Sequence, residues 1–403
     1  MLRSEFRLEK CNKGLKKHNS DFVLDNFVET EVKSLLPLYL AQCLSLAPKY
    51  SIRYDFITSN SSHFCAFVSL CAVVIAAFWF YFVFDVLWTS GTLYSITLFA
   101  YSITVMIVYI INSTVTTSKS NMSAFLIILI QKIHRDFKYV KFNTRNITIV
   151  DWIFVTAMIV FNVLHFVLRL VEERGSVIRM FLVHFMYVDF NFTLIIEVRL
   201  IYLLGKYIDT WILELENVCC ANSLDDRGTD YNIQNKEARM KKIITAYDKI
   251  LEALDICNKI FGLSILFTVV MSFIQVFFNL QYIILVSIYK KLYSVLPSWK
   301  RTMYISQTLW IKNITLLSIL CMESENVCLK MKNAEVACTM LSATDSSAEL
   351  CRVLHLRGPR ASASSGAGWL SAAGFFSVDA ALPPRFLAVL ATYTVVILKF
   401  YFL

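Results

Sequence analysis

Seven long apolar runs constrain the fold of this chain more than any other feature of its sequence. They lie at about residues 64–88, 91–115, 149–171, 178–204, 260–286, 302–322 and 381–403. A run of about 18 or more apolar residues is long enough to cross a hydrocarbon core of ~30 Å as a helix. The composition agrees, since 57% of the residues are hydrophobic and only 17% are charged. The sequence therefore predicts an all-α membrane protein with seven transmembrane helices.

The positions of Lys and Arg predict how these helices are oriented. The segments expected on one side of the membrane hold 25 such residues, and these segments are 1–33, 116–148, 205–258 and 323–369. The segments expected on the other side hold five, and these are 89–90, 172–177 and 287–301. Because positive charge accumulates in cytoplasmic loops, we expect a cytoplasmic N-terminus and an extracellular C-terminus. The first 33 residues lack the apolar core of a signal peptide, so the first span is expected to direct insertion.

Domain boundaries follow from the same pattern. We expect a cytoplasmic N-terminal segment at 1–33, an interfacial helix at 34–50 preceding six spans that end at 322, a cytoplasmic helix and loop at 323–380, and a last span at 381–403. Apolar residues recur every three or four positions in the stretches 124–142 and 325–343 and, within the region 205–258, in the string "DKILEALDICNKI" that begins at Asp248. These stretches predict amphipathic helices that extend the spans and pack into a cytoplasmic anchor domain, between subunits. Helices lying on the membrane surface are the alternative. The Gly/Ser/Ala-rich stretch 355–370 predicts a loop.

Polar and aromatic residues inside the spans are candidates for a ligand pocket. Ionisable residues in a membrane are expensive to bury and are functional candidates by default. An apolar cavity with a few convergent polar groups suits a small molecule. The candidates are His165, Arg169, His184, Gln275, Asn279, Tyr304, Gln307 and Trp310. The alternative is that these side chains pair with one another as contacts between helices.

Other kinds of chemistry find little support in the sequence. The eleven cysteines lack metal-ligand spacing, so we expect no metal site, and no cofactor motif is present. There is no phosphate-binding loop, no Ser-His-Asp arrangement and no pair of carboxylates at catalytic spacing. The net charge of +9 lies in particular loops, where it sets orientation and does not indicate nucleic acid. We therefore do not expect an enzyme.

Two segments resemble the insect gustatory receptors. The stretch "LSAAGFFSVDAAL…ATYTVVILKF" at 370–400 is similar to that family's C-terminal signature, in the tetrad Ala373-Gly374-Phe375-Phe376 and in Asp379, Thr392, Tyr393 and Phe400. "LPLYLAQCLSLAP" near the N-terminus is similar to a second family segment, with Ser45 where Gly is usual. There are departures too, because Lys399 stands where the family has Gln, and Pro383-Pro384 interrupts the start of the last helix, which we therefore expect to begin near Arg385. Thr394 replaces the Glu typical of sugar-receptor members, which argues against a sugar receptor.

The resemblance implies a ligand-gated, non-selective cation channel in the plasma membrane of a sensory neuron. Its implied partners are membrane lipid, a small-molecule tastant and other gustatory receptor subunits, in a homo- or heterotetramer. In such a channel the last helix of each subunit lines the pore, and the ligand pocket lies in the outer half of the other helices. The pore and gate candidates in this sequence are Thr392, Tyr393, Val395, Val396, Lys399 and Phe400.

Helical spacing places four of these candidates on one face of the last helix, namely Thr392, Val395, Val396 and Lys399. If that face lines a four-fold pore, four Lys399 side chains form a ring that opposes cations. The alternative is that Lys399 snorkels to the membrane interface and does not affect conduction.

Three other classes of protein compete with this interpretation. An odorant receptor of the same channel superfamily has the same architecture. A metabotropic seven-helix receptor has the opposite topology and two motifs that this sequence lacks. A secondary transporter should show an internal repeat, and none is evident. A non-functional product also stays open, given Lys399, the paired prolines and the Gly/Ser-rich stretch.

Overall fold

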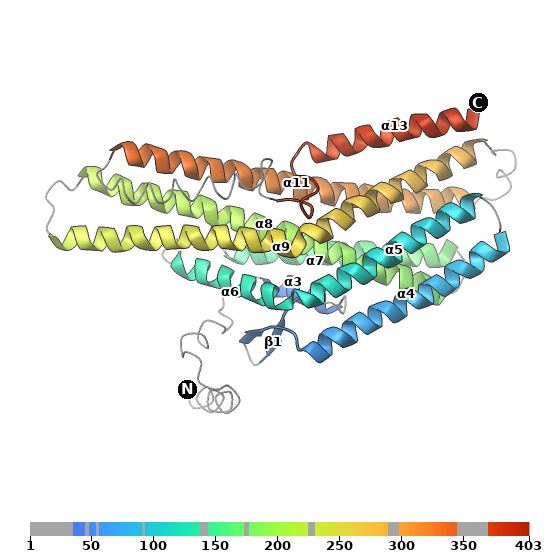
Figure 1. Cartoon of the computed structure of the whole chain (residues 1–403), viewed down its shortest axis with the longest axis horizontal. Helices are drawn as coiled ribbons and strands as arrows, with labels where there is room; N and C mark the ends of the chain where they lie inside the picture. The colour runs from blue at the N-terminus through green and yellow to red at the C-terminus, as the bar shows by residue number, and fades with distance from the viewer. Residues whose placement is uncertain are drawn as a thin grey trace.

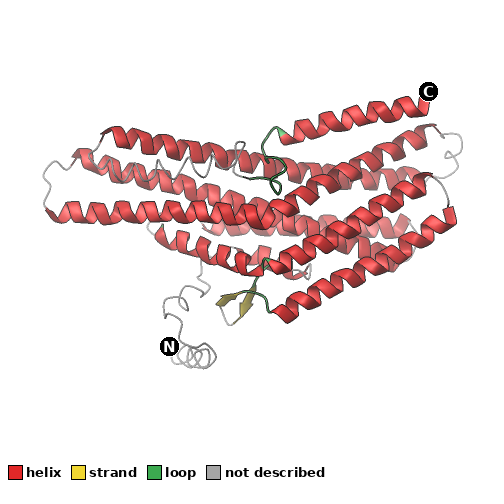
Figure 2. Cartoon of the chain, viewed as in Figure 1, coloured by secondary structure: helices red, strands yellow, loops and turns green. Residues whose placement is uncertain are grey.

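The chain folds as a bundle of long helices with one small hairpin of strands. The structure is a computed structural model that describes residues 35–44, 48–53, 56–90, 93–137, 144–172, 177–224, 230–288, 298–344 and 370–402. The helices are α3 (Leu36–Leu44), α4 (Ser62–Ser90), α5 (Leu93–Ser118), α6 (Ser120–Asp136), α7 (Thr144–Glu172), α8 (Val177–Leu224), α9 (Asp230–Ile288), α11 (Ser298–Thr344) and α13 (Leu382–Phe402). Strands β1 (Ser51–Arg53) and β2 (Phe56–Thr58) pair antiparallel. Figure 2 shows how fully helix dominates.

The predicted apolar runs all coincide with helices, so the prediction of a mostly helical protein is confirmed. Among the described residues, three helical segments are by themselves long and apolar enough to cross a membrane, namely Ser62–Phe84, Asn146–Val171 and Ala238–Gln281. A fourth exists if Phe99–Val115 and Ser120–Asp136 count as one span bent by 61°. Leu382–Val396 is apolar but shorter. The number of seven spans and their orientation remain predictions.

Three helices extend far beyond the predicted spans. Helices α8, α9 and α11 contain 48, 59 and 47 residues. At 1.5 Å per residue each is about 70 Å long or longer, roughly twice the ~30 Å thickness of a hydrocarbon core. Figure 1 shows these three helices running side by side beyond the ends of α4, α5 and α13. Only part of each helix can therefore lie in lipid.

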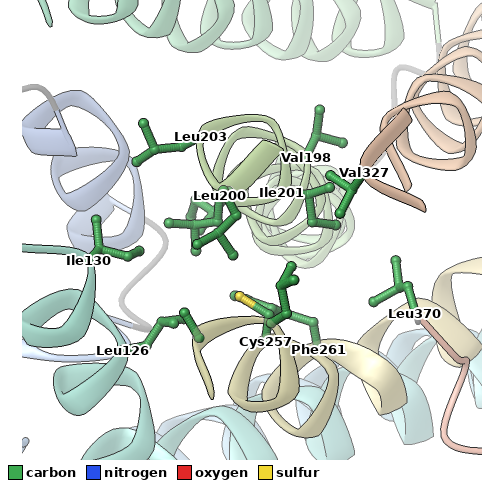
Figure 3. Close-up of a cluster of buried hydrophobic side chains, with 14 of the residues drawn as sticks. Leu126, Ile130, Val198, Leu200, Ile201, Leu203, Cys257, Phe261, Val327 and Leu370 are labelled. Atoms are coloured by element: carbon green, nitrogen blue, oxygen red, sulfur yellow. The ribbon is translucent and has the colours of Figure 1, made fainter. Parts of the chain in front are cut away.

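Helix α8 forms the centre of the bundle. Every residue from Asn191 to Ile201 is buried, and so are most residues from there to Trp211. A helix that is buried all round must be covered by neighbours on every side. Figure 3 shows Val198, Leu200, Ile201 and Leu203 of α8 among side chains of α6, α9 and α11.

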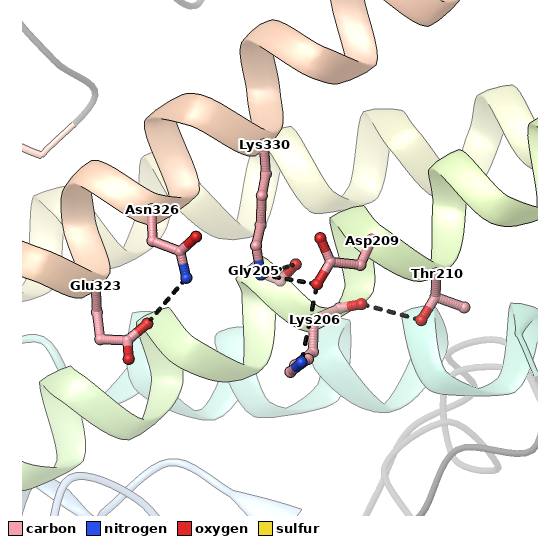
Figure 4. Close-up of polar contacts among 7 residues, drawn as sticks. All are labelled: Gly205, Lys206, Asp209, Thr210, Glu323, Asn326 and Lys330. Atoms are coloured by element: carbon pink, nitrogen blue, oxygen red, sulfur yellow. Dashed lines mark hydrogen bonds and ion pairs between the residues drawn. The ribbon is translucent and has the colours of Figure 1, made fainter.

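Polar contacts tie the extensions to one another within one chain. Lys330 Nζ of α11 donates to Asp209 Oδ2 of α8 at 2.7 Å and to the Gly205 carbonyl at 3.3 Å (Figure 4). Trp211 Nε1 of α8 donates to the Ile243 carbonyl of α9 at 2.9 Å. The apolar faces predicted in these stretches thus find partners in the same subunit. Packing between subunits remains a prediction.

The N-terminal segments and the loop 355–370 are described only in part. Residues 1–34 lie outside the described residues, and so do 355–369 of the predicted loop. The helix expected over 34–50 is shorter, since α3 spans Leu36–Leu44 and the chain then forms the β1–β2 hairpin. Pro37 sits in the first turn of α3, where the missing N–H is tolerated.

The last helix begins earlier than the sequence suggests. Pro383 and Pro384 were expected to interrupt its start, with the helix proper beginning near Arg385, but α13 begins at Leu382 and includes both. Proline is tolerated in the first helical turn because its N–H would have no partner there. Asp379 stabilises the turn just before the N-terminal end of α13, since its Oδ1 accepts a hydrogen bond from the Ala381 N–H at 3.1 Å.

A tight turn in residues 370–379 precedes α13. Ala373 and Gly374 in this turn both have positive φ angles, of 52° and 82°. Glycine adopts positive φ easily, whereas such angles are uncommon for alanine. The turn is anchored to α9, because Asn258 Oδ1 accepts from the Ser371 N–H at 3.0 Å. A Cβ atom on Gly262 of α9 would lie 2.9 Å from the Ser371 carbonyl oxygen. Gly262 therefore allows the turn to approach the helix.

We predict that Gly262→Ala destabilises the protein by about 1–3 kcal/mol, because overpacking here pushes against backbone atoms. The measurement is thermal unfolding of the purified protein in detergent. Gly374→Asn is the comparison variant, because a Cβ there meets nothing within 4 Å, so its cost comes from the positive φ of 82° and not from overpacking. It should cost less than Gly262→Ala, since Asn is among the residues that adopt positive φ most readily. Equal melting temperatures for Gly262→Ala and wild type would contradict the tight docking of the turn.

Candidate functional site in the transmembrane bundle

One face of α13 is exposed in the single chain. Thr392, Val395, Val396 and Lys399 are all exposed, with Val395 at 54%. The opposite face packs on α9, where Phe386 and Tyr393 both meet the ring of Phe273 edge-on at 5.9 Å. Figure 1 shows α13 at the edge of the bundle. These four residues share the face that helical spacing predicted, and other residues of α13 are exposed as well, including Leu387, Val389 and Leu398.

Two of the pore candidates differ from the other four. Tyr393 is half exposed, but its ring contacts Phe273 and Phe277 of α9. Tyr393, the second residue of the Thr-Tyr signature, therefore helps to hold α13 against α9. The side chain of Phe400 lies outside the described residues.

The structure brings the two candidate histidines together. His165 Nδ1 of α7 and His184 Nε2 of α8 are 2.7 Å apart, and both side chains are buried. One imidazole must donate and the other accept, since a bond between two ring nitrogens needs one proton. Phe161 stacks on His165 with ring centroids 6.2 Å apart, so the pair lies in an aromatic setting.

A second set of hydrogen bonds joins α7 and α8 to α11. Lys312 Nζ of α11 donates to Asn191 Oδ1 of α8 at 2.5 Å, and Asn191 Nδ2 donates to Asn162 Oδ1 of α7 at 3.1 Å. The Lys312 ammonium also lies 5.4 Å from the ring centroid of Phe161. Because Phe161 contacts both, Lys312 and the histidine pair form one polar region between α7, α8 and α11.

The remaining candidates lie on other helices of the bundle. Gln275 of α9 is buried and its Oε1 accepts from Asn313 Nδ2 of α11 at 2.8 Å, so it pairs with a residue that was not predicted. Asn279 is also buried, whereas Arg169, Gln307 and Trp310 are half-buried. The side chain of Tyr304 lies outside the described residues.

Sequence reasoning missed several members of this polar region, namely Asn162, Asn191, Lys312 and Asn313. A lysine inside a predicted span is a sufficient signal by itself, and Lys312 lies in the middle of the run 302–322. The asparagines gave no comparable signal, because Asn occurs at many positions in the chain.

A buried cation lies where α3 meets the central helices. Lys49 is 5% exposed and its Nζ lies 4.1 Å from the ring centroid of Phe261 in α9. Burial lowers the pKa of Lys49 to about 8, against the opposing effect of the Glu197 and Asp189 carboxylates. Lys49 is thus a buried basic group that interacts with the Glu197 and Asp189 carboxyls.

Comparisons with known proteins show a likeness in fold. No family model and no curated protein matches the sequence. Among solved structures, the chain is similar to the insect olfactory receptor OR5 from Machilis hrabei, with a TM-score of 0.60 and 12% sequence identity. The match covers 91% of this chain and 98% of that receptor. This chain has the fold of an insect olfactory receptor over nearly its whole length.

Proposed function

We propose that this protein is a subunit of a ligand-gated, non-selective cation channel of the insect chemosensory superfamily, acting as a gustatory receptor in the plasma membrane of a sensory neuron. The observation that carries the proposal is the likeness in fold to an insect olfactory receptor over 91% of the chain. The C-terminal signature with Thr392-Tyr393 supports the gustatory class. An enzymatic or transport function has no comparable support.

In the proposed channel four subunits surround one pore, and the exposed face of α13 lines it. This use of α13 accounts for an apolar helix whose outer face finds no neighbour among the described residues of its own chain. The assembly is a homotetramer or a heterotetramer with other gustatory receptor subunits. The ligand is a small molecule other than a sugar, held in the polar region around His165, His184 and Lys312.

The second candidate function is an odorant receptor, which the solved structure itself favours because that protein is an olfactory receptor. The two functions share the channel mechanism and differ in the ligand. The C-terminal signature is the feature of the sequence that separates them, and it favours taste.

Currents recorded from excised outside-out patches test the channel proposal. A channel opens in a patch bathed in solutions without nucleotides, whereas a metabotropic receptor needs G proteins and GTP. We would apply caffeine, quinine and sucrose as tastants, and 1-octanol and 2-heptanone as volatiles, with patches from untransfected cells as the control. Cation currents evoked by a tastant in the nucleotide-free patch support the gustatory channel. Currents evoked only by volatiles would favour the odorant receptor, and responses only in intact cells would contradict a channel.

The histidine pair predicts a pH-dependent response to the ligand. Acid conditions favour adding a proton to one imidazole of the pair, which places a positive charge in the polar region, whereas two imidazolium groups at 2.7 Å would repel each other. We expect the half-maximal concentration of an active tastant to change severalfold between pH 7.5 and pH 5.5 in the wild type. In His165→Gln/His184→Gln the change should be less than twofold. The same change with pH in both proteins would remove the pair from ligand binding.

A further inference from the structure

A cavity of about 340 Å³ lies apart from the polar region described above. It is lined by α3, the β1–β2 hairpin, the N-terminal half of α4, and parts of α5 and α8, near the point where β1 lies beside α4 in Figure 1. None of the eight pocket candidates and six pore candidates given above lines it, but Asp189, an ionisable residue inside the predicted span 178–204, does. Its volume falls within the ~300–1,000 Å³ typical of sites for small molecules.

The deepest charged group in the cavity wall is a carboxylate. Asp189 of α8 lines the cavity and is only 2% exposed. Asn112 Nδ2 of α5 donates to Asp189 Oδ2 at 3.1 Å, which holds the side chain in place. A charge in such a buried place interacts more strongly with a ligand than a charge in water does, because the local dielectric constant is lower.

The rest of the wall is largely aromatic. Phe64 and Phe67 of α4, Tyr109 of α5 and Phe185 of α8 all line the cavity. Aromatic faces attract cations as well as apolar groups, so these rings suit a ligand that carries both.

Two basic residues lie near this cavity, and neither favours an anionic ligand in its interior. Arg53 on β1 lines the cavity but is exposed to solvent, so its charge is well screened. Lys49 is buried, lines a different, smaller cavity and lies over the ring of Phe261, and its charge is already offset in part by the Glu197 and Asp189 carboxyls.

We propose that this cavity binds a small primary amine with an aromatic or alkyl body. The ammonium group binds the Asp189 carboxylate, and the body packs among the rings of Phe64, Phe67 and Phe185. The site is separate from the pocket assigned to the tastant, and it gives the protein a second place at which a small molecule binds. Binding here does not depend on whether the chain conducts ions.

Equilibrium binding of a labelled probe to the purified full-length chain tests this proposal. The probe is tritiated 2-phenylethylamine, and its uncharged match is 2-phenylethanol, which has the same ring and chain length. Wild type should bind the amine saturably and at least tenfold more tightly than the alcohol. Asp189→Asn should weaken the amine at least tenfold and change the alcohol less than twofold, because only the amine uses the charge.

Two further variants separate loss of the site from loss of the fold. Cys71→Phe adds a ring to the cavity wall and should weaken both probes at least tenfold, while the protein elutes as wild type from size exclusion. Asp255→Asn makes the same chemical change as Asp189→Asn at an exposed surface position, and should leave both affinities unchanged. The proposal is overturned if the amine shows no saturable binding, if amine and alcohol bind equally well, or if Cys71→Phe folds and still binds the amine with wild-type affinity.

Discussion

Replacing Arg199 by methionine is expected to lower the free energy of unfolding by about 3–5 kcal/mol, because it leaves a buried carboxylate without its counter-ion. Arg199 of α8 donates through Nε to Asp151 of α7, and the two side chains are 7% and 0% exposed. Asp151 Oδ2 has no hydrogen-bond partner among the described residues, so the carboxylate depends heavily on Arg199. The Arg199 guanidinium also lies 4.7 Å from the ring centroid of Tyr202.

Thermal unfolding in detergent measures this effect, with a drop in melting temperature of roughly 4–6 °C expected for Arg199→Met. The double variant Asp151→Leu/Arg199→Met should regain most of the loss, because it removes both charges together. Arg239→Met is the matched control, since Arg239 pairs with Glu214 at 3.1 Å but is 57% exposed, and it should change stability by less than about 1 kcal/mol. If Arg199→Met melts at the wild-type temperature, the pair does not stabilise the contact between α7 and α8.

The second large effect is expected from Lys399→Gln, which should increase cation current severalfold. Lys399 lies on the exposed face of α13 together with Thr392, Val395 and Val396. In a tetramer with this face toward the pore, four ammonium groups act on one passing cation. At a separation of about 7 Å in water, each contributes about 0.6 kcal/mol of repulsion. Screening by salt reduces the sum of about 2.4 kcal/mol to about 1 kcal/mol, which corresponds to a severalfold change.

Whole-cell currents and reversal potentials under a NaCl gradient measure the effect of Lys399. The reversal potential of Lys399→Gln should move toward that of Na⁺, because the ring no longer favours anions. Lys399→Arg is the matched control and should behave as wild type, since it keeps the charge. Equal currents and equal reversal potentials in wild type and Lys399→Gln would show that Lys399 snorkels to the interface and lies outside the conduction path.

The helices were predictable because long apolar runs leave the backbone few alternatives in lipid. The residues at which the helices begin and end were harder to predict. The pair Pro383-Pro384 suggested a late start for α13, yet both prolines fit its first turn. The extension of α9 ahead of its apolar run follows from the amphipathic spacing after Asp248, but the contacts between extensions, such as Lys330 with Asp209, join residues 121 positions apart. Pairings of that kind depend on how the helices pack.

The candidate site was predictable only in part, for the same reason. His165 and His184 were both candidates as ionisable residues inside predicted spans, and the structure joins them. Helical spacing predicts that Thr392, Val395, Val396 and Lys399 share one face of α13, and the use of that face as a pore lining stays a prediction. The cavity beside Asp189 could not be predicted, because its wall combines residues of α3, the β1–β2 hairpin, α4, α5 and α8. No local pattern in the sequence shows that these segments meet.

The sidedness of the C-terminus tests most directly whether α13 crosses the membrane as the seventh span of a channel subunit. It needs no ligand and no current. An epitope would be fused after Leu403, and intact and permeabilised cells would be stained, with plasma-membrane fractionation to show delivery. A second protein with the epitope before Met1 is the matched control, and it should stain only after permeabilisation. The channel account predicts that the C-terminal epitope is stained on intact cells. Staining of that epitope only after permeabilisation, in protein that has reached the plasma membrane, would contradict the seven-span topology and the channel proposed from it.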